Sequence, residues 1–254
     1  MALARPRQRR DLVWELIARN IKLRYRRSIL GIAWSQLAPL SMIAVFSFVF
    51  GRIVPLKIPD YPAFLFVGLL PWIWFQTSLL TGTQSVTGSR DLVRQPGFPL
   101  PLLPVVAIGS GLINYLLALP VMFIWIGATT GHIRVTAVAL PAILAVQFLI
   151  VLGPAYLLAA IQVTFRDVGH IVEILLLPLF YATPIFYAQY PARYHVIYDL
   201  NPLARLMTAY RSTLIAGRWP DVSVLSLLAL VGMGMTAFGY WVFDRRAHRF
   251  AEEL

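Results

Sequence analysis

The sequence has no cysteine, few charged residues and no phosphate-binding loop. The absence of Cys among 254 residues excludes disulfide bonds, thiolate metal sites and cysteine nucleophiles, and it leaves the redox compartment open. Charged residues make up only 13% of the chain. No Gly-x-x-x-x-Gly-Lys-Ser/Thr segment occurs, so we expect no NTPase site on this chain. Any energy from ATP must therefore come from another subunit.

Apolar residues are abundant instead. They make up 59% of the chain, and the mean hydropathy is +0.71. A soluble core of this size cannot hide so much apolar surface, so the surplus is expected to face lipid. About 20 helical residues cross a hydrocarbon layer of about 30 Å. Six segments reach this length and predict an all-α integral membrane protein with one transmembrane domain over residues 1–254. The predicted spans are 31–51, 61–82, 104–127, 135–161, 171–190 and 222–243.

The Lys and Arg residues are distributed unevenly between the two sides of these spans. Fifteen of the 22 fall in the N-terminal segment, in the loops after the second and fourth spans and after the sixth span, and seven fall in the other loops. The positive-inside rule then places both termini in the cytoplasm. Because the basic residues are separated by long apolar runs, nucleic-acid binding is not expected despite the net charge of +11. The first apolar run has full bilayer length, so no cleavable signal peptide is expected.

Groups that could carry chemistry at membrane depth are scarce. The central thirds of the six spans contain no Asp, Glu, His or Arg, which argues against ion-coupled transport. Asn114 and Gln147 lie in mid-span, where hydrogen bonds between helices are the favoured role and substrate binding is the alternative. The histidines are scattered over different loops and both predicted faces, namely His132, His170, His195 and His248. We therefore expect no catalytic residue, metal site or cofactor on this chain.

Residues 11–30 are predicted to form an amphipathic helix that lies flat on the inner leaflet. Its apolar side consists of Leu12, Leu16, Ile17 and Ile21. Its polar side and inner-face aromatic residue are Glu15, Arg19, Lys22, Arg26 and Trp14. Two roles fit the basic side chains: contact with lipid phosphates that fixes the topology, or docking of a cytoplasmic partner.

The fifth span is unusual because it contains several prolines. Pro178, Pro184 and Pro191 follow one another closely, and a proline inside a helix removes a backbone donor. The helix is expected to break near Pro184. After the Asn201-Pro202 turn signal, residues 203–215 are predicted to be helical. We expect two short external helices that dip into the outer leaflet, with a surface helix lying on the membrane as the alternative.

Aromatic side chains are frequent in the second span and around the break in the fifth. Most fit the ordinary aromatic belt of membrane interfaces. A second interpretation is that some line a pathway for sugars, because flat aromatic faces stack on the apolar faces of pyranose rings. The residues considered are Trp72, Trp74, Tyr181, Phe186 and Tyr187.

Four segments together resemble the permeases of the type-2 ABC exporter family, in the branch that exports polysaccharides and polyol phosphates such as O-antigen, capsule and teichoic acid precursors. The similarity extends over nearly the whole chain. The segments are LIARNIKLRYRRSILGIAWSQLAPL (16–40), RDLVRQPGFPLPLLP (90–104), FRDVGHIVEILLLPLFYATPIFY (165–187) and NPLARLMTAYRSTL (201–214).

This resemblance implies a homodimer in the bacterial inner membrane, bound to two copies of a cytoplasmic ABC ATPase that holds ATP and Mg. The substrate would be a lipid-linked glycan. The short helix after the second span would couple to the ATPase, with the N-terminal helix as a second contact, and the external helices would form a gate carrying Tyr210 and Arg211. The implied coupling residues are Arg90, Asp91, Leu92, Val93 and Arg94.

One feature of the coupling segment departs from the family pattern. Pro96 and Gly97 interrupt the stretch between Arg94 and Phe98, so the coupling helix is expected to end early. Two alternative functions also stay open. A related exporter of a drug or small lipid would differ in cargo and not in fold. A non-transport membrane enzyme or scaffold of glycan assembly would need an acid, base or metal constellation that the sequence does not offer.

Overall fold

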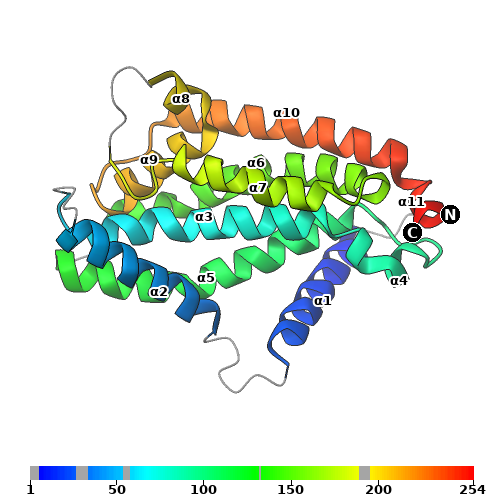
Figure 1. Cartoon of the computed structure of the whole chain (residues 1–254), viewed down its shortest axis with the longest axis horizontal. Helices are drawn as coiled ribbons and strands as arrows, with labels where there is room; N and C mark the ends of the chain where they lie inside the picture. The colour runs from blue at the N-terminus through cyan, green and yellow to red at the C-terminus, as the bar shows by residue number, and fades with distance from the viewer. Residues whose placement is uncertain (1–5, 27–33, 54–57, 132, 189–194) are drawn as a thin grey trace.

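The computed structural model describes residues 6–26, 34–53, 58–131, 133–188 and 195–254, and within these ranges it contains helices and no strand (Figure 1). This confirms the all-α prediction. The helices, in chain order, are α1 (Pro6–Tyr25), α2 (Trp34–Phe48) continued by the π-helix η2 (Val49–Ile53), α3 (Tyr61–Thr83), the short 3-10 helix η3 (Thr87–Ser89), α4 (Arg90–Val93), α5 (Leu102–Thr130), the 3-10 helix η4 (Val135–Ala139), α6 (Leu140–Thr164), α7 (Val168–Tyr181), α8 (His195–Leu200), α9 (Pro202–Leu214), α10 (Val222–Ala247) and α11 (Phe250–Glu253).

Five of the helical segments are long and apolar enough to cross a membrane. They match the predicted first, second, third, fourth and sixth spans, with ends that differ by a few residues. The first predicted span begins at residues 31–33, which lie outside the described residues. The five segments are Gln36–Ile53, Tyr61–Thr83, Leu102–Thr129, Val135–Thr164 and Val222–Ala247.

The predicted fifth span differs from the structure. The helix there, α7, has only 14 residues, which at about 1.5 Å per residue falls short of a bilayer core of about 30 Å. It ends at Tyr181, three residues before Pro184, whose ring disfavours helical backbone at the preceding residue. The predicted break near Pro184 is therefore confirmed, and the structure has a shorter apolar helix where the sequence predicted a sixth span over residues 171–190. Residues 189 and 190 lie outside the described part.

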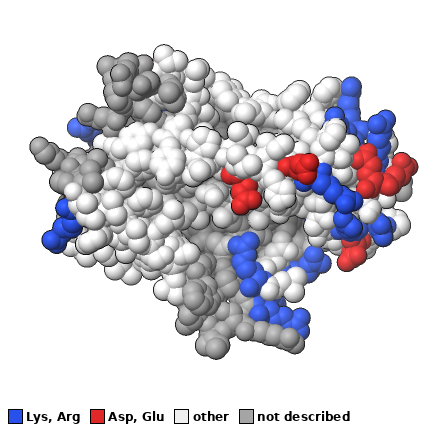
Figure 2. Space-filling view, viewed as in Figure 1, with Lys and Arg blue, Asp and Glu red and all other residues white. Residues whose placement is uncertain are grey.

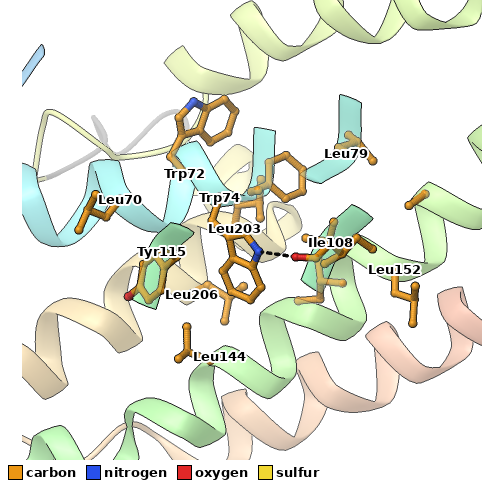
Figure 3. Close-up of a cluster of buried hydrophobic side chains, with 14 of the residues drawn as sticks. Leu70, Trp72, Trp74, Leu79, Ile108, Tyr115, Leu144, Leu152, Leu203 and Leu206 are labelled. Carbon is orange, nitrogen blue, oxygen red and sulfur yellow. Dashed lines mark hydrogen bonds between the residues drawn. The ribbon is translucent and has the colours of Figure 1, made fainter. Parts of the chain in front are cut away.

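The long helices lie side by side, and the short helices gather at the two ends of the bundle (Figure 1). Helices α4 and α11 contact each other at one end, and α8 and α9 contact each other at the other end. Helix α3 is the centre of the bundle, because it contacts α2, α5, α6, α7 and α9 and is buried over most of its length. Its side chains Trp72 and Trp74 fill the core together with residues of α5, α6 and α9 (Figure 3).

Glycines bring α6 and α10 into close contact. A Cβ atom added to Gly153 in α6 would lie 2.5 Å from the backbone carbonyl carbon of Met235 in α10. A Cβ atom added to Gly239 in α10 would overlap the carbonyl oxygen of Gly153. Small residues at such crossings let two backbones approach without an intervening side chain, which is a common way to associate helices in lipid.

Helix α1 packs on the bundle through its apolar side. Leu16 and Ile17 are buried against Val106 of α5, and a Cβ atom on Gly109 would lie 2.7 Å from the Ile17 side chain. The N-terminal helix predicted at residues 11–30 is thus observed as Pro6–Tyr25, and residues 27–30 lie outside the described part. The apolar side that was expected to face the leaflet instead covers α5.

Candidate functional site

One end of the bundle presents the polar turn formed by η3 and α4. Val93 is buried and anchors the turn, while Arg90, Asp91 and Arg94 are exposed and Leu92 is half-buried. The helix has a single turn, and its last hydrogen bond runs from Arg94 N to Arg90 O over 3.0 Å. The early end expected from Pro96-Gly97 is therefore confirmed.

The C-terminal helix α11 adds a surface to this end that the sequence prediction missed. It packs against α4 and α6. Phe250 is buried with its ring centroid 5.1 Å from that of Phe243 in α10, and Thr164 Oγ1 donates a 2.8 Å hydrogen bond to Glu253 Oε2. The one sequence feature that could have indicated this packing is Phe250, a single aromatic residue within a short polar segment. These contacts place Glu252 and Glu253 beside the α4 turn.

At the opposite end, Asn201 fixes the start of α9. Its side-chain oxygen accepts a hydrogen bond from Leu203 N (3.0 Å), which is a standard N-cap. Its Nδ2 donates to Ala182 O (3.1 Å) and Thr183 Oγ1 (3.0 Å), just after the end of α7. One side chain therefore joins the break after α7 to the helix that follows it.

A buried polar link connects α9 to α6 and α3. Tyr210 donates to Gln147 Oε1 over 2.7 Å, and Gln147 Nε2 donates to Pro71 O over 2.8 Å. Tyr210 and Gln147 are both fully buried. The prediction that Gln147 bonds between helices is confirmed. Because the members of this link satisfy one another, α9 is held inside the protein at this point and does not lie loosely on its surface.

Arg211 joins three segments around the break after α7. Its guanidinium donates to Pro184 O (2.5 Å) and Ile185 O (2.6 Å) and lies 3.5 Å from the centroid of the Phe64 ring in α3. The site has little spare room, since a Cβ atom on Gly68 would lie 2.7 Å from Arg211 Nη2. The break leaves the carbonyls of Pro184 and Ile185 without helical partners, and the Arg211 guanidinium binds both. Backbone polar groups removed from water need such a hydrogen-bond partner.

The predicted pathway aromatics separate into two groups. Trp72, Trp74 and Tyr210 are buried in the core, and Trp74 Nε1 donates to Ile108 O over 3.3 Å (Figure 3). Tyr181 is exposed, and Phe186 and Tyr187 are half-buried. Only the second group presents ring surface to the outside of this chain.

Phe186 is the centre of an aromatic cluster at this end. Its ring centroid lies 5.5 Å from that of Phe50, 5.8 Å from those of Phe180 and Tyr181, and 4.9 Å from that of Tyr187. The cluster joins η2, the end of α7 and the residues after it. The aromatic residues around Pro184 could be identified from the sequence, but the packing of Phe50 against them could not.

The basic side chains of α1 lie outside the helix contact with α5. Arg19, Lys22 and Arg26 are exposed, as is Trp14. Lys and Arg side chains gather along α1 and at the end that carries α4 and α11, while the helices between the two ends are largely without charge (Figure 2). This distribution matches the loops that the sequence placed on one side of the membrane.

Possible metal ligands do not cluster in the part of the chain that the structure describes. Among the described residues, no group of three or more His, Cys, Asp or Glu side chains could hold a metal ion. The pKa of Asp221 is lowered by hydrogen bonds from the Ser223 hydroxyl and from the backbone N–H groups of Val224 and Ser223. These bonds identify Asp221 as the N-cap of α10, which is a structural role.

Residues 11–215 match the family described as ABC-2 type transporter. The chain belongs to this family. It is 37% identical over 252 residues to an O-antigen export system permease protein RfbA of Myxococcus xanthus, covering 97% of this chain and 96% of that protein. It is 28% identical to an RfbA of Klebsiella pneumoniae (96% and 95% covered) and 25% identical to the polysialic acid transport protein KpsM of Escherichia coli (91% and 92% covered).

Membership of the ABC-2 transporter family agrees with the features of the sequence and the structure. The chain is a multi-pass membrane permease, and its sequence lacks the phosphate-binding loop of an ATPase. Its buried Gln147 and Tyr210 bind between helices, and the charged side chains of the α4 turn project from one end of the bundle. Such an arrangement suits a membrane subunit that moves a substrate without reacting with it.

Proposed function

We propose that this chain is the membrane permease of an ATP-driven exporter of lipid-linked polysaccharide of the O-antigen or capsule type. The observation that carries the proposal is the 37% identity to an O-antigen export permease across 97% of the chain. The match to a polysialic acid transport protein supports a polymeric sugar as cargo. A teichoic acid type of cargo has the same physical demands, namely a wet path and no tight binding site.

Two copies of the chain would work with two copies of a separate cytoplasmic ABC ATPase that binds ATP and Mg. The missing phosphate-binding loop supports this division of labour. The exposed α4 turn supports a docking role, because it projects three charged side chains from the end of the bundle. The basic side chains at this end support a cytoplasmic location for both termini in the bacterial inner membrane.

Helix α7 and the short helices after it would complete a sixth crossing. The turn after α7 is satisfied by Asn201 and Arg211, so non-helical backbone here can exist at membrane depth. Helices α8 and α9 would then form an external gate. The exposed ring of Tyr181 and the half-buried rings of Phe186 and Tyr187 would face the passing polymer, because aromatic faces stack on sugars without holding them tightly.

In this mechanism ATP closes the ATPase pair, and the α4 turns of the two permease copies move with it. The movement is transmitted through α3, which follows α2 and ends directly before η3 and α4. Near the other end of α3, Phe64 contacts Arg211, and in the middle of the helix Pro71 O accepts from Gln147. A shift of α3 at the ATPase end of the bundle would therefore move α9 at the opposite end, where the polymer leaves.

Reversing the charge of the α4 turn is expected to separate ATP hydrolysis from export. The double change Arg90→Glu and Arg94→Glu should reduce export at least about tenfold, because like charges at an interface cost several kcal/mol. Both side chains are exposed, so the protein should still accumulate to its normal level. The measurement is surface polysaccharide per cell together with immunoblotting of the permease.

The control is Arg218→Glu, an exposed arginine at the opposite end of the bundle. It makes the same type of charge change away from α4 and should leave export unchanged. Wild-type export by the Arg90/Arg94 variant at normal protein level would show that α4 does not couple to the ATPase.

Deleting the gene in its host tests the function itself. We expect lipid-linked polysaccharide to accumulate inside the cell while surface polysaccharide is lost. Unchanged surface polysaccharide with altered sensitivity to drugs would instead favour a small-molecule exporter. Absence of any polymer would favour a role in glycan assembly.

A further inference from the structure

A cavity of about 280 Å³ lies between α1, the end of α3 with η3 and α4, and α5. It lies at the end of the bundle that carries α4, since Ser89 and Leu92 are among its lining residues. Leu16, Leu103 and Val106 form part of its apolar wall. Its polar lining comes from all of these elements and includes Arg19, Arg24, Gln84, Ser85, Ser89 and Asn114.

The polar lining is suited to an anion. Two arginines of α1, Arg19 and Arg24, line the cavity, and none of the described residues that line it is Asp or Glu. Guanidinium groups bind phosphate oxygens through paired, charge-assisted hydrogen bonds. Hydroxyl and amide groups on the opposite wall supply further donors. The lining therefore differs from a salt-bridged surface, in which carboxylates would occupy the arginines.

The surroundings indicate that the ligand is a lipid. The cavity lies where the long apolar helices α3 and α5 end, and lipid headgroups lie at the ends of membrane spans. Leu23, at the rim, is largely exposed and offers apolar surface beside the two arginines. We propose that this cavity binds the phosphate group of an anionic lipid from the cytoplasmic leaflet.

Two lipids carry this chemistry. One is an ordinary anionic phospholipid, and the other is a polyprenyl diphosphate of the kind that would carry the exported polysaccharide. The second identification rests on the proposed function, and the first does not. The two are distinguished by comparing phosphatidylglycerol with a polyprenyl diphosphate as probes.

The test is a titration of the purified full-length chain in neutral detergent with each probe, followed by native mass spectrometry. The double variant Arg19→Gln and Arg24→Gln should bind the preferred probe at least about tenfold more weakly, since hydrogen bonds to charged groups are worth this much. The matched control is Lys22→Gln and Arg26→Gln, which removes the same charge from two residues that do not line the cavity; they line a neighbouring groove, which Arg19 also lines. The control should change affinity by less than about threefold.

Equal losses in both double variants would mean diffuse attraction to the charge of α1 and would overturn the proposal. Full affinity in the Arg19/Arg24 variant would overturn it as well.

The outcome also separates this site from the proposed function. Selective binding of phosphatidylglycerol would establish the cavity as a phospholipid site and leave the export assignment to the deletion experiment. Selective binding of polyprenyl diphosphate would identify it as a site for the carrier of the exported polymer.

Discussion

Arg211→Gln is expected to lower the free energy of unfolding by about 3 kcal/mol, because it removes charged hydrogen bonds to two carbonyls and a contact with an aromatic ring. The guanidinium is bound to Pro184 O, Ile185 O and the face of Phe64. Glutamine is shorter and uncharged, so it cannot reach both carbonyls and the ring. The midpoint of thermal unfolding in detergent should fall by about 6–12 °C for a chain of this size.

The matched control for this change is Arg218→Gln, which also removes one positive charge near the end of α9. Arg218 is exposed, and surface charges contribute about 1 kcal/mol or less. Its unfolding midpoint should stay within about 2 °C of the wild-type value. If both variants unfold at the wild-type temperature, Arg211 does not hold the segments around the break together.

Gly239→Ala is expected to destabilise the protein by about 2 kcal/mol or more, since overpacking of a tight contact costs about 1–3 kcal/mol and sometimes more. The added methyl group would overlap the carbonyl oxygen of Gly153 on α6. Because backbone atoms cannot rotate aside, α10 must move away from α6 along their extensive contact. The measurement is the unfolding midpoint together with the fraction of monodisperse protein in size-exclusion chromatography.

Gly234→Ala on the same helix is the matched control, and its expected effect on stability has the opposite sign. A Cβ atom at Gly234 meets no atom within 4 Å. Alanine is the better helix former by about 0.5–1 kcal/mol, so this variant should be as stable as the wild type or slightly more stable. Equal destabilisation by both changes would contradict the close α6–α10 crossing.

The long spans could be predicted from the sequence because they depend only on uninterrupted apolar length. Charge-free runs such as residues 61–82 leave few alternatives to a membrane helix. The break in the fifth span was also predictable, because Pro184 acts through its own ring and the residue before it. The length of the helix was harder to predict, since α7 continues through Pro178 and ends after 14 residues, shortly before Pro184.

Contacts between segments distant in the sequence were much harder to predict. The amphipathic pattern of α1 is the same whether its apolar side covers lipid or α5, so burial of Ile17 against Gly109 could not be inferred. Arg211 was assigned to the external gate by family resemblance alone. Nothing in its local sequence indicates that it binds the carbonyls of Pro184 and Ile185, more than 25 residues earlier.

The sequence also could not show which aromatic side chains are buried and which could line a pathway. Trp72 and Tyr181 have similar sequence surroundings, because each lies in an apolar segment beside other aromatic residues. The first is 2% exposed and the second 59% exposed. Periodicity cannot make this distinction in helices that are apolar on all sides.

The most direct test of the central claim is ATP-driven movement of the polymer across a membrane. Inverted inner-membrane vesicles would contain this chain, its ATPase partner and labelled lipid-linked polysaccharide, and a glycosidase added outside would report how much polymer stays accessible. We predict that ATP makes the polymer resistant to the glycosidase, and that vesicles without this chain, or with Arg90→Glu and Arg94→Glu, show no such protection. Equal protection without ATP or without this chain would contradict the claim that it is the permease of a polysaccharide exporter.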